Sequence, residues 1–119
     1  MTADRRRKAE SAGRRAETIA AGWLRLKGYR IVARRHRTPV GEIDLLAKRG
    51  RTLVAVEVKE RPGREIGLAA VSEKQWSRIA RTVEWTLSSR PDLAESVIRF
   101  DLVVVCGLRP HHIIDAWRP

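Results

Sequence analysis

The stretch Gly41 to Arg61, GEIDLLAKRGRTLVAVEVKER, predicts two β-strands joined by a tight basic turn. Polar and apolar residues alternate from Gly41 to Ala47, and Thr52 to Lys59 is rich in β-branched residues. Successive side chains of a strand point to opposite faces of its sheet. The second strand should therefore present two sets of side chains: Leu53, Ala55, Glu57 and Lys59 on one face, and Val54, Val56 and Val58 on the other.

The turn between these strands decides which polar side chains meet. If Lys48–Arg51 forms a four-residue hairpin loop, Asp44 lies opposite Ala55 on the second strand. Directly opposed residues project to the same face of a sheet, so Asp44 would converge with Glu57 and Lys59. A slip of one residue would turn Asp44 to the other face and separate it from them.

This cluster of charged side chains has two readings. Two carboxylates and an ammonium suit a Mg²⁺ site, because this ion takes oxygen ligands and often binds one or two carboxylates together with water and phosphate. Alternatively, Glu57 and Lys59 form a solvated pair on an edge strand, which contributes little to stability. The spacing of the residues leaves both readings open.

The length and composition indicate one domain with a modest core. No run in the 119 residues approaches the ~18 apolar residues of a membrane span, and the charged first residues show no secretory signal. The single cysteine, Cys106, cannot form an internal disulfide, which fits a reducing compartment. We therefore expect a cytoplasmic protein without a membrane partner.

The charge is high and unevenly distributed. The net charge is +11, and residues 1–40 hold 12 Lys and Arg against 3 Asp and Glu, whereas residues 41–119 hold 13 against 11. A basic half favours a polyanionic partner, with nucleic acid first and an acidic membrane surface second. The alternative is a highly charged, solvated surface without a specific partner.

Residues 1–10 are expected to form a mobile basic arm ahead of a single domain at 11–119. This arm carries Arg5, Arg6 and Arg7, and it lacks apolar periodicity. Its expected role is non-specific contact with phosphates, which weakens as salt concentration rises.

The spacing of apolar residues from about Ser11 to Lys27 predicts a first helix that ends at Gly28. Glu17 falls at the margin of the apolar stripe. It either pairs on the surface with Arg14 or Arg15, or points along the sheet toward the other carboxylates. The helical pattern leaves both positions open.

The remaining segments complete the order helix, three strands, helix, two strands. A strand is predicted at 29–34, a loop that could cover a substrate at 60–67, a helix from Ser72 with a capping box to Gln75, and strands at 97–106 and 111–117. The order indicates an α/β fold with a small mixed sheet flanked by helices. No glycine-rich phosphate loop is present, and His111 and His112 are interpreted as residues on the strand surface.

The sequence resembles the YraN family of bacterial proteins, predicted nucleases distantly similar to archaeal Holliday junction resolvases. The most specific feature is GEID at Gly41–Asp44 followed by VEVK at Val56–Lys59. The resemblance covers most of the chain and includes Glu17, Trp23-Leu24, Gly28-Tyr29, Glu60-Arg61, Lys74, Arg78, Arg99-Phe100-Asp101 and His112 to Trp117. It implies membership of the PD-(D/E)XK nuclease superfamily, whose restriction-endonuclease-like core has the order αβββαβ.

The resemblance also implies a role for each matching residue. Asp44 corresponds to the first metal-binding aspartate of the superfamily, although Ile43 precedes it where proline is common. Glu57 and Lys59 correspond to the (D/E)-x-K half of the motif. Glu17 corresponds to the extra glutamate that resolvase-like members carry on the first helix.

These roles together imply a metal-dependent, structure-selective DNA endonuclease. Mg²⁺ or Mn²⁺ would bind Asp44 and Glu57, with the Val58 carbonyl and Glu17 as further ligands. Lys59 would orient the attacking water or stabilise the transition state.

The DNA, which the analogy suggests is branched, would be held mainly through its backbone. Arg61, Lys74 and Arg78 would either contact flanking phosphates or form a solvated face. Symmetric cutting of two strands would favour a homodimer. The alternative function is a non-catalytic, basic nucleic-acid-binding module with a degenerate nuclease fold.

Overall fold

The computed structural model describes residues 2–119 as an α/β fold. In chain order, the elements are α1 (Ala3–Leu26), β1 (Arg30–Arg37), β2 (Glu42–Arg49), β3 (Thr52–Glu60), α2 (Arg64–Ala69), α3 (Glu73–Ser89), the short 3₁₀ helix η1 (Pro91–Leu93), β4 (Val97–Cys106) and β5 (Arg109–Trp117). The predicted fold class is confirmed, because three strands follow the first helix and two more follow α3.

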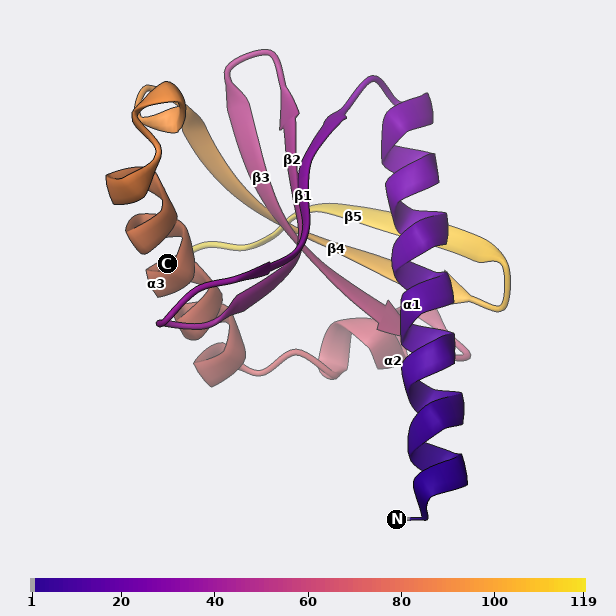
Figure 1. Ribbon diagram of the computed structural model, residues 1–119. Helices are drawn as coiled ribbons and strands as arrows, with labels where there is room; N and C mark the ends of the chain where they lie inside the picture. The colour runs from indigo at the N-terminus through magenta and orange to yellow at the C-terminus, as the bar shows by residue number, and fades with distance from the viewer. Residues whose placement is uncertain (1) are drawn as a thin grey trace.

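The five strands form one mixed sheet in the order β1-β2-β3-β4-β5. Neighbouring strands are antiparallel except for β3 and β4, which are parallel. Parallel neighbours need a crossover connection rather than a hairpin, and α2 and α3 provide it here (Figure 1). The last residues of β3 therefore lead directly into the helices that cover the sheet.

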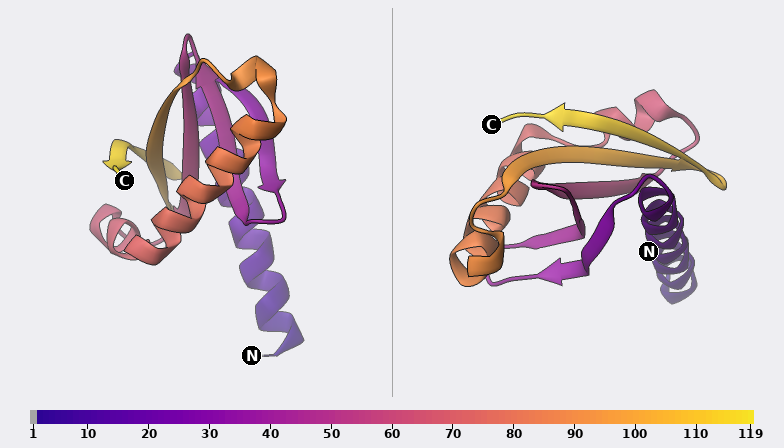
Figure 2. Two further views of the ribbon diagram at one scale, coloured as in Figure 1. Left: turned by 90° about the vertical axis from the view of Figure 1, so that its left-hand side faces the viewer. Right: turned by 90° about the horizontal axis from the view of Figure 1, so that it is seen from above.

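Helices cover both faces of the sheet, and the alternating pattern of β3 supplies a core to each (Figures 1 and 2). Leu53 and Ala55 belong to the apolar cluster that includes α3. Val54 and Val56 are buried in the cluster under α1, and Val58 packs against it. The two predicted faces of this strand are confirmed from Leu53 to Val58, since Glu57 contacts Gln75 of α3.

The β2–β3 hairpin is tighter than predicted. Arg49 pairs with Thr52 and Leu45 with Val56, so the loop contains two residues, with Gly50 at a φ of +59°. The predicted four-residue loop is wrong, because glycine adopts the left-handed conformation that a two-residue hairpin requires. The error is a shift of two residues, which leaves the side chains from Leu45 to Arg49 on their predicted faces.

The alternation of β2 breaks at Asp44. Ile43 and Leu46 both pack in the α3 cluster, whereas Leu45 packs in the α1 cluster, although Ile43 and Leu45 are two residues apart. The pairing of β2 with β3 also ends at Leu45. Asp44 therefore lies where β2 separates from β3, near the carboxyl end of β3.

The first helix begins at Ala3, so the prediction of a start near Ser11 is wrong. Thr2 caps the helix by accepting a hydrogen bond from the Arg5 amide at 3.2 Å. The polar first half extends past the rest of the molecule, with Arg5, Arg6 and Arg7 exposed on it (Figures 1 and 2). The helical conformation of this first half was missed because it has no apolar periodicity. Extending an existing helix does not need that periodicity, and Arg is a good helix former. Within residues 2–119, none of the helices is both long enough and apolar enough to span a bilayer.

Two segments around the crossover differ in how well they were predicted. The helix α2 at Arg64–Ala69 occupies part of the predicted loop, and it fits closely against β4 because a Cβ on Gly67 would overlap Val104. The start of α3 is confirmed, since the Ser72 side chain caps the helix by accepting from the Gln75 amide at 3.1 Å.

Candidate active site

Asp44 connects the ends of β2 and β3. Its Oδ2 accepts a hydrogen bond from the backbone N–H of Val58 at 2.9 Å. The pairing of β2 with β3 extends only as far as Leu45, the residue after Asp44. The Asp44 side chain therefore takes the place of the backbone as hydrogen-bond partner for this part of β3. The half-buried carboxylate is thereby held against the strand that carries Glu57 and Lys59.

Glu57 is buried beside Asp44, with 7% of its surface exposed. Burial, and then the adjoining Asp44 carboxyl, raise the pKa of Glu57 from 4.5 to about 9, whereas Lys59 and the hydrogen bond from Gln75 lower it. Two acids that share one place cannot both ionise without cost. A proton or a cation at this place would offset the charge of the pair.

Gln75 is a site residue that sequence reasoning missed. It lies in the first turn of α3 and donates a hydrogen bond from Nε2 to the Glu57 carboxylate. The sequence assigned its side chain to a capping box with Ser72, but only the Ser72 half of that box forms. A glutamine at this position can accept from the Ser72 amide through its oxygen or donate to Glu57 through its nitrogen, so the sequence could not show which contact forms.

Asp44 and Glu17 line one cavity of about 430 Å³ between α1 and the β1–β2 hairpin. Glu17 is 7% exposed, and its Oε2 accepts from Arg35 Nε at 2.7 Å. The sequence left Glu17 either paired on the surface or pointing toward the carboxylates. In the structure it faces the cavity of Asp44 and pairs with Arg35, not with Arg14 or Arg15. The cavity is lined by Glu10, Gly13, Arg14, Glu17, Arg35, Arg37, Glu42, Asp44 and Val58.

Lys59 lies in a neighbouring hollow. This hollow, of about 580 Å³, is lined by Lys59, Arg61 and the N-terminal half of α1, and it shares Val58 with the cavity of Asp44. The predicted residues thus lie around the carboxyl end of β3, but they do not share one cavity. Asp44 lines the cavity that contains Glu17 and Arg35, whereas Lys59 lines the hollow next to it.

The donor set suits Mg²⁺ or Mn²⁺ better than a metal that needs a closed cage. Within residues 2–119, no three His, Cys, Asp or Glu side chains are arranged to hold a metal ion. Mg²⁺ usually binds through one or two carboxylates plus water and phosphate. Asp44 and Glu57 fit that requirement, because they are adjacent and their charges are incompletely compensated.

Two of the predicted phosphate-binding residues lie at exposed positions near this end of the sheet, and Arg61 is half-buried. Lys74 and Arg78 are exposed on the first turns of α3, and the aliphatic part of Arg78 packs over Gly41. A Cβ on Gly41 would lie 2.7 Å from the Thr82 hydroxyl and 3.3 Å from Arg78 Cγ. The glycine that begins GEID therefore allows α3 to approach β2 closely.

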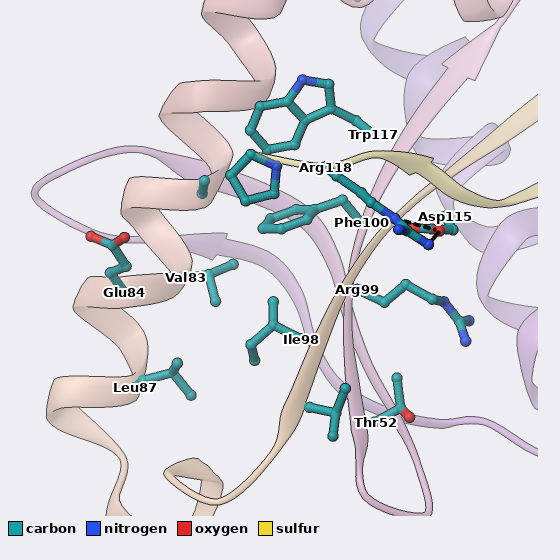
Figure 3. A pocket seen from close by; sticks show the side chains of 13 residues that line it. Thr52, Val83, Glu84, Leu87, Ile98, Arg99, Phe100, Asp115, Trp117 and Arg118 are labelled. Atoms are coloured by element: carbon teal, nitrogen blue, oxygen red, sulfur yellow. Dashed lines mark hydrogen bonds and ion pairs between the residues drawn. The ribbon is translucent and has the colours of Figure 1, made fainter.

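A larger cavity lies away from the carboxylates. It has a volume of about 670 Å³, and Figure 3 shows Val83 and Leu87 of α3 facing Ile98 and Phe100 of β4, with the Arg118–Asp115 ion pair at the rim. Its walls are mostly apolar and include none of the predicted site residues. It is therefore not the candidate active site.

A second polar network surrounds Asp101 of β4. Asp101 is fully buried and accepts two hydrogen bonds from Arg99 at 2.8 Å, one from His112 Nε2 at 2.7 Å and one from the Asp115 amide at 2.9 Å. The interpretation of His112 as a strand-surface residue is wrong, because its side chain is 2% exposed. Its partner Asp101 lies on the neighbouring strand, where local sequence gave no signal.

Comparisons with known proteins match most of the chain, including the residues around the end of β3. The family described as "Uncharacterised protein family UPF0102" matches residues 16–105. A UPF0102 protein of Parvibaculum lavamentivorans is 48% identical over 108 residues, which cover 90% of this chain and 81% of that protein. A UPF0102 protein of Maricaulis maris is 45% identical over 115 residues, covering 96% of this chain and 91% of that protein.

Proposed function

The chain belongs to the UPF0102 family, and from its site and its charge we propose that it is a metal-dependent, structure-selective DNA endonuclease. This proposal places it in the PD-(D/E)XK superfamily, with Asp44, Glu57 and Lys59 as the catalytic set. The protein has a net charge of +11, which favours a polyanionic substrate.

One observation carries the proposal: a buried glutamate and a neighbouring aspartate lie at the end of β3 with incomplete compensation of their charge. The raised pKa of Glu57 expresses the cost of keeping both acids ionised at this place. A divalent cation would remove that cost by supplying the opposite charge. A purely structural buried carboxylate, by contrast, is expected to have its charge compensated by protein donors, as Arg99 and His112 compensate Asp101.

The roles of the residues follow from this arrangement. Asp44 and Glu57 would hold Mg²⁺ or Mn²⁺, with the Val58 carbonyl as a further ligand. Glu17, which pairs with Arg35, would become a ligand only if it released that arginine. When bound, the ion supplies a Lewis acid that lowers the pKa of water and offsets charge on the phosphate. Gln75 would orient Glu57, and Lys59 would donate to the attacking water or to a phosphate oxygen.

The proposed DNA interface consists of backbone contacts. Arg61 lies beside Lys59, and Lys74 and Arg78 are exposed on α3. Arg5, Arg6 and Arg7 extend the basic surface along the protruding half of α1. Phosphate contacts position a nucleic acid without reading its sequence, so selectivity for branched DNA would arise from shape.

The proposal is tested by cleavage of branched, single-stranded and duplex DNA in Mg²⁺ or Mn²⁺. We expect Lys59→Ala to lower the cleavage rate by about 10²- to 10³-fold, because it removes a donor to the reacting phosphate. Asp44→Asn should lower it at least as much. Asp92→Asn is the matched control, since Asp92 is an exposed carboxylate paired with Arg90 at 2.8 Å.

The alternative function predicts a different pattern. A non-catalytic nucleic-acid-binding module would bind the same DNAs in wild type, Lys59→Ala and Asp44→Asn, without cutting any of them. The Arg35–Glu17 ion pair supports this alternative, because an arginine already neutralises a glutamate that the resemblance assigns to the metal. Binding without cleavage by the wild type in both metals would overturn the endonuclease proposal.

A further inference from the structure

Arg35 adopts an unusual backbone conformation beside the acidic cavity. Its φ is +49°, in the left-handed region that residues other than glycine rarely occupy. The neighbouring residues Arg34 and His36 are paired with β2 on either side of it. Strained residues of this kind persist where the surrounding structure holds them, and they are frequent at functional sites.

The conformation brings two consecutive side chains to the α1 face of the sheet. Arg34 Nη2 donates to Thr18 Oγ1 at 2.8 Å, and Arg35 Nε donates to Glu17 Oε2 at 2.7 Å. His36, the next residue, contacts Thr86 of α3 on the opposite face. In a regular strand, Arg34 and Arg35 would point to opposite faces, so the left-handed residue is what places the Arg35 guanidinium in the cavity.

The Arg35 guanidinium lies in an environment of carboxylates. The hydrogen bond to Glu17 raises the pKa of Arg35, and the charges of Glu17, Glu42 and Asp44 act in the same direction, against the opposing effect of burial. The Glu17 side chain is 10% exposed, so its other contacts with water are limited. Arg35 thus provides positive charge where a divalent cation would otherwise provide it.

We propose that Arg35 is a positioning residue that acts as a resident counter-cation and competes with the divalent ion for Glu17. This inference rests on the proposed function, since it concerns the same carboxylates. Two cations in one small cavity repel each other, and a carboxylate that already accepts a guanidinium hydrogen bond is a weaker metal ligand. The affinity for Mg²⁺ or Mn²⁺ is therefore set by the Arg35–Glu17 pair as well as by Asp44 and Glu57.

The test measures Mn²⁺ binding by titration calorimetry, without substrate and without an activity readout. Arg35→Asn removes the guanidinium while suiting the backbone, because asparagine tolerates the left-handed conformation. We expect Mn²⁺ to bind this variant about three- to tenfold more tightly than wild type. Arg34→Asn is the matched control, since it removes the same charge from the adjacent residue, whose partner is the Thr18 hydroxyl. It should change the affinity by about twofold or less.

A double-mutant cycle with Glu17→Gln assigns the gain to the pair. In the wild-type background, Glu17→Gln should leave Mn²⁺ affinity nearly unchanged, because Arg35 already occupies Glu17. In the Arg35→Asn background, the same change should cancel the gain. The first of these measurements tests the inference without altering residue 35, so it stands even if Arg35→Asn folds poorly.

The outcomes separate this inference from the proposed function. If wild type, Arg34→Asn and Arg35→Asn bind Mn²⁺ equally and Asp44→Asn does not bind, Arg35 has no such role and the metal site stands. If Glu17→Gln alone weakens binding strongly in the wild type, Glu17 is a ligand despite Arg35 and the inference is overturned. Absence of Mn²⁺ binding in every variant would overturn both the inference and the metal site.

Discussion

Two buried carboxylates on neighbouring strands have opposite electrostatic environments. Asp101 of β4 is aligned with Val56 of β3, one residue before Glu57. Asp101 lies on the face of α1, with Val103 two residues beyond it under that helix, whereas Glu57 contacts Gln75 of α3. The two acids are thus close in register but separated by the sheet.

The protein compensates the charge of Asp101 more fully than that of Glu57. Burial alone would raise the pKa of Asp101, but the hydrogen bonds from His112, Arg99 and the Asp115 amide outweigh it and lower the pKa. Glu57 receives one side-chain hydrogen bond, from Gln75, and adjoins another acid, so its pKa is raised to about 9. The difference indicates that the first acid serves stability, while the second is retained at a cost that a bound cation would relieve.

The Asp101 network extends to the C-terminal end of α1. Arg99 Nη2 donates to the Tyr29 hydroxyl at 2.6 Å, and Lys27 Nζ lies 2.6 Å from His112 Nδ1. Since a lysine ammonium can only donate, His112 accepts through Nδ1 and donates through Nε2 to Asp101. The side chains of Lys27, His112 and Asp101 are thereby joined by hydrogen bonds, as expected of a network that links α1 to the sheet.

The largest expected effect is on the Asp101 side of this comparison. Asp101→Asn should lower the free energy of unfolding by about 3 kcal/mol, because it leaves Arg99 and His112 without their buried anion. Urea denaturation monitored by circular dichroism measures the loss. The exposed Asp92→Asn should change the denaturation midpoint little. A midpoint for Asp101→Asn equal to that of Asp92→Asn would show that the network does not stabilise the fold.

The next effect concerns the dependence of stability on pH, which should have opposite signs for Glu57 and Asp101. The folded pKa of Glu57 lies above its ordinary value of 4.5, so the folded protein binds more protons and its stability falls as pH rises toward about 9. The slope for one such proton reaches about 1.4 kcal/mol per pH unit. Asp101 has a lowered pKa, so its contribution is present at neutral pH and is lost as pH falls through its folded pKa.

Glu57→Gln isolates this pH dependence. Without divalent cations, urea denaturation at pH 6, 7 and 8 should show a decreasing stability for wild type and a flatter profile for the variant. Glutamine keeps an oxygen that can accept from Gln75, so the hydrogen bond is retained. Parallel profiles for the two proteins would contradict the assignment of a proton to the Asp44–Glu57 pair.

The smallest effect is stabilisation by the cation itself. Mg²⁺ at ten times its dissociation constant should raise the free energy of unfolding by about 1.4 kcal/mol, because it binds the folded state alone. Asp44→Asn should abolish this gain, whereas Asp101→Asn should retain it on a lower baseline. Equal gains in Asp44→Asn and wild type would place the cation elsewhere on the protein.

The helices and strands were predictable where periodicity carries the signal. The two faces of β3, the cap at Ser72 and the order of elements follow from local patterns that need no distant contact. The start of α1 was missed because its first half has no buried face, and α2 was missed because the Gly/Pro-marked segment around Gly67 resembles a loop. The hairpin register was wrong by two residues, an error that alternation does not detect.

The sequence drew attention to three candidate site residues but did not show how their side chains are arranged. Asp44, Glu57 and Lys59 are conspicuous because charged residues end apolar strands. Gln75, Arg35 and the Asp101–His112 contact carried no such signal, since each depends on a partner many residues away. The left-handed conformation at Arg35 also could not be read from the sequence, because the residue is neither glycine nor asparagine.

The sequence by itself determined the α/β order, the two-sided burial of β3 and the presence of acidic residues at its carboxyl end, because strand alternation is a local property. The tertiary structure alone decided how each charge is compensated. It gave Asp101 four hydrogen bonds, gave Glu17 an arginine and left Glu57 beside another acid. Compensation depends on distances between side chains from different elements, and those distances exist only after the sheet and helices have packed together.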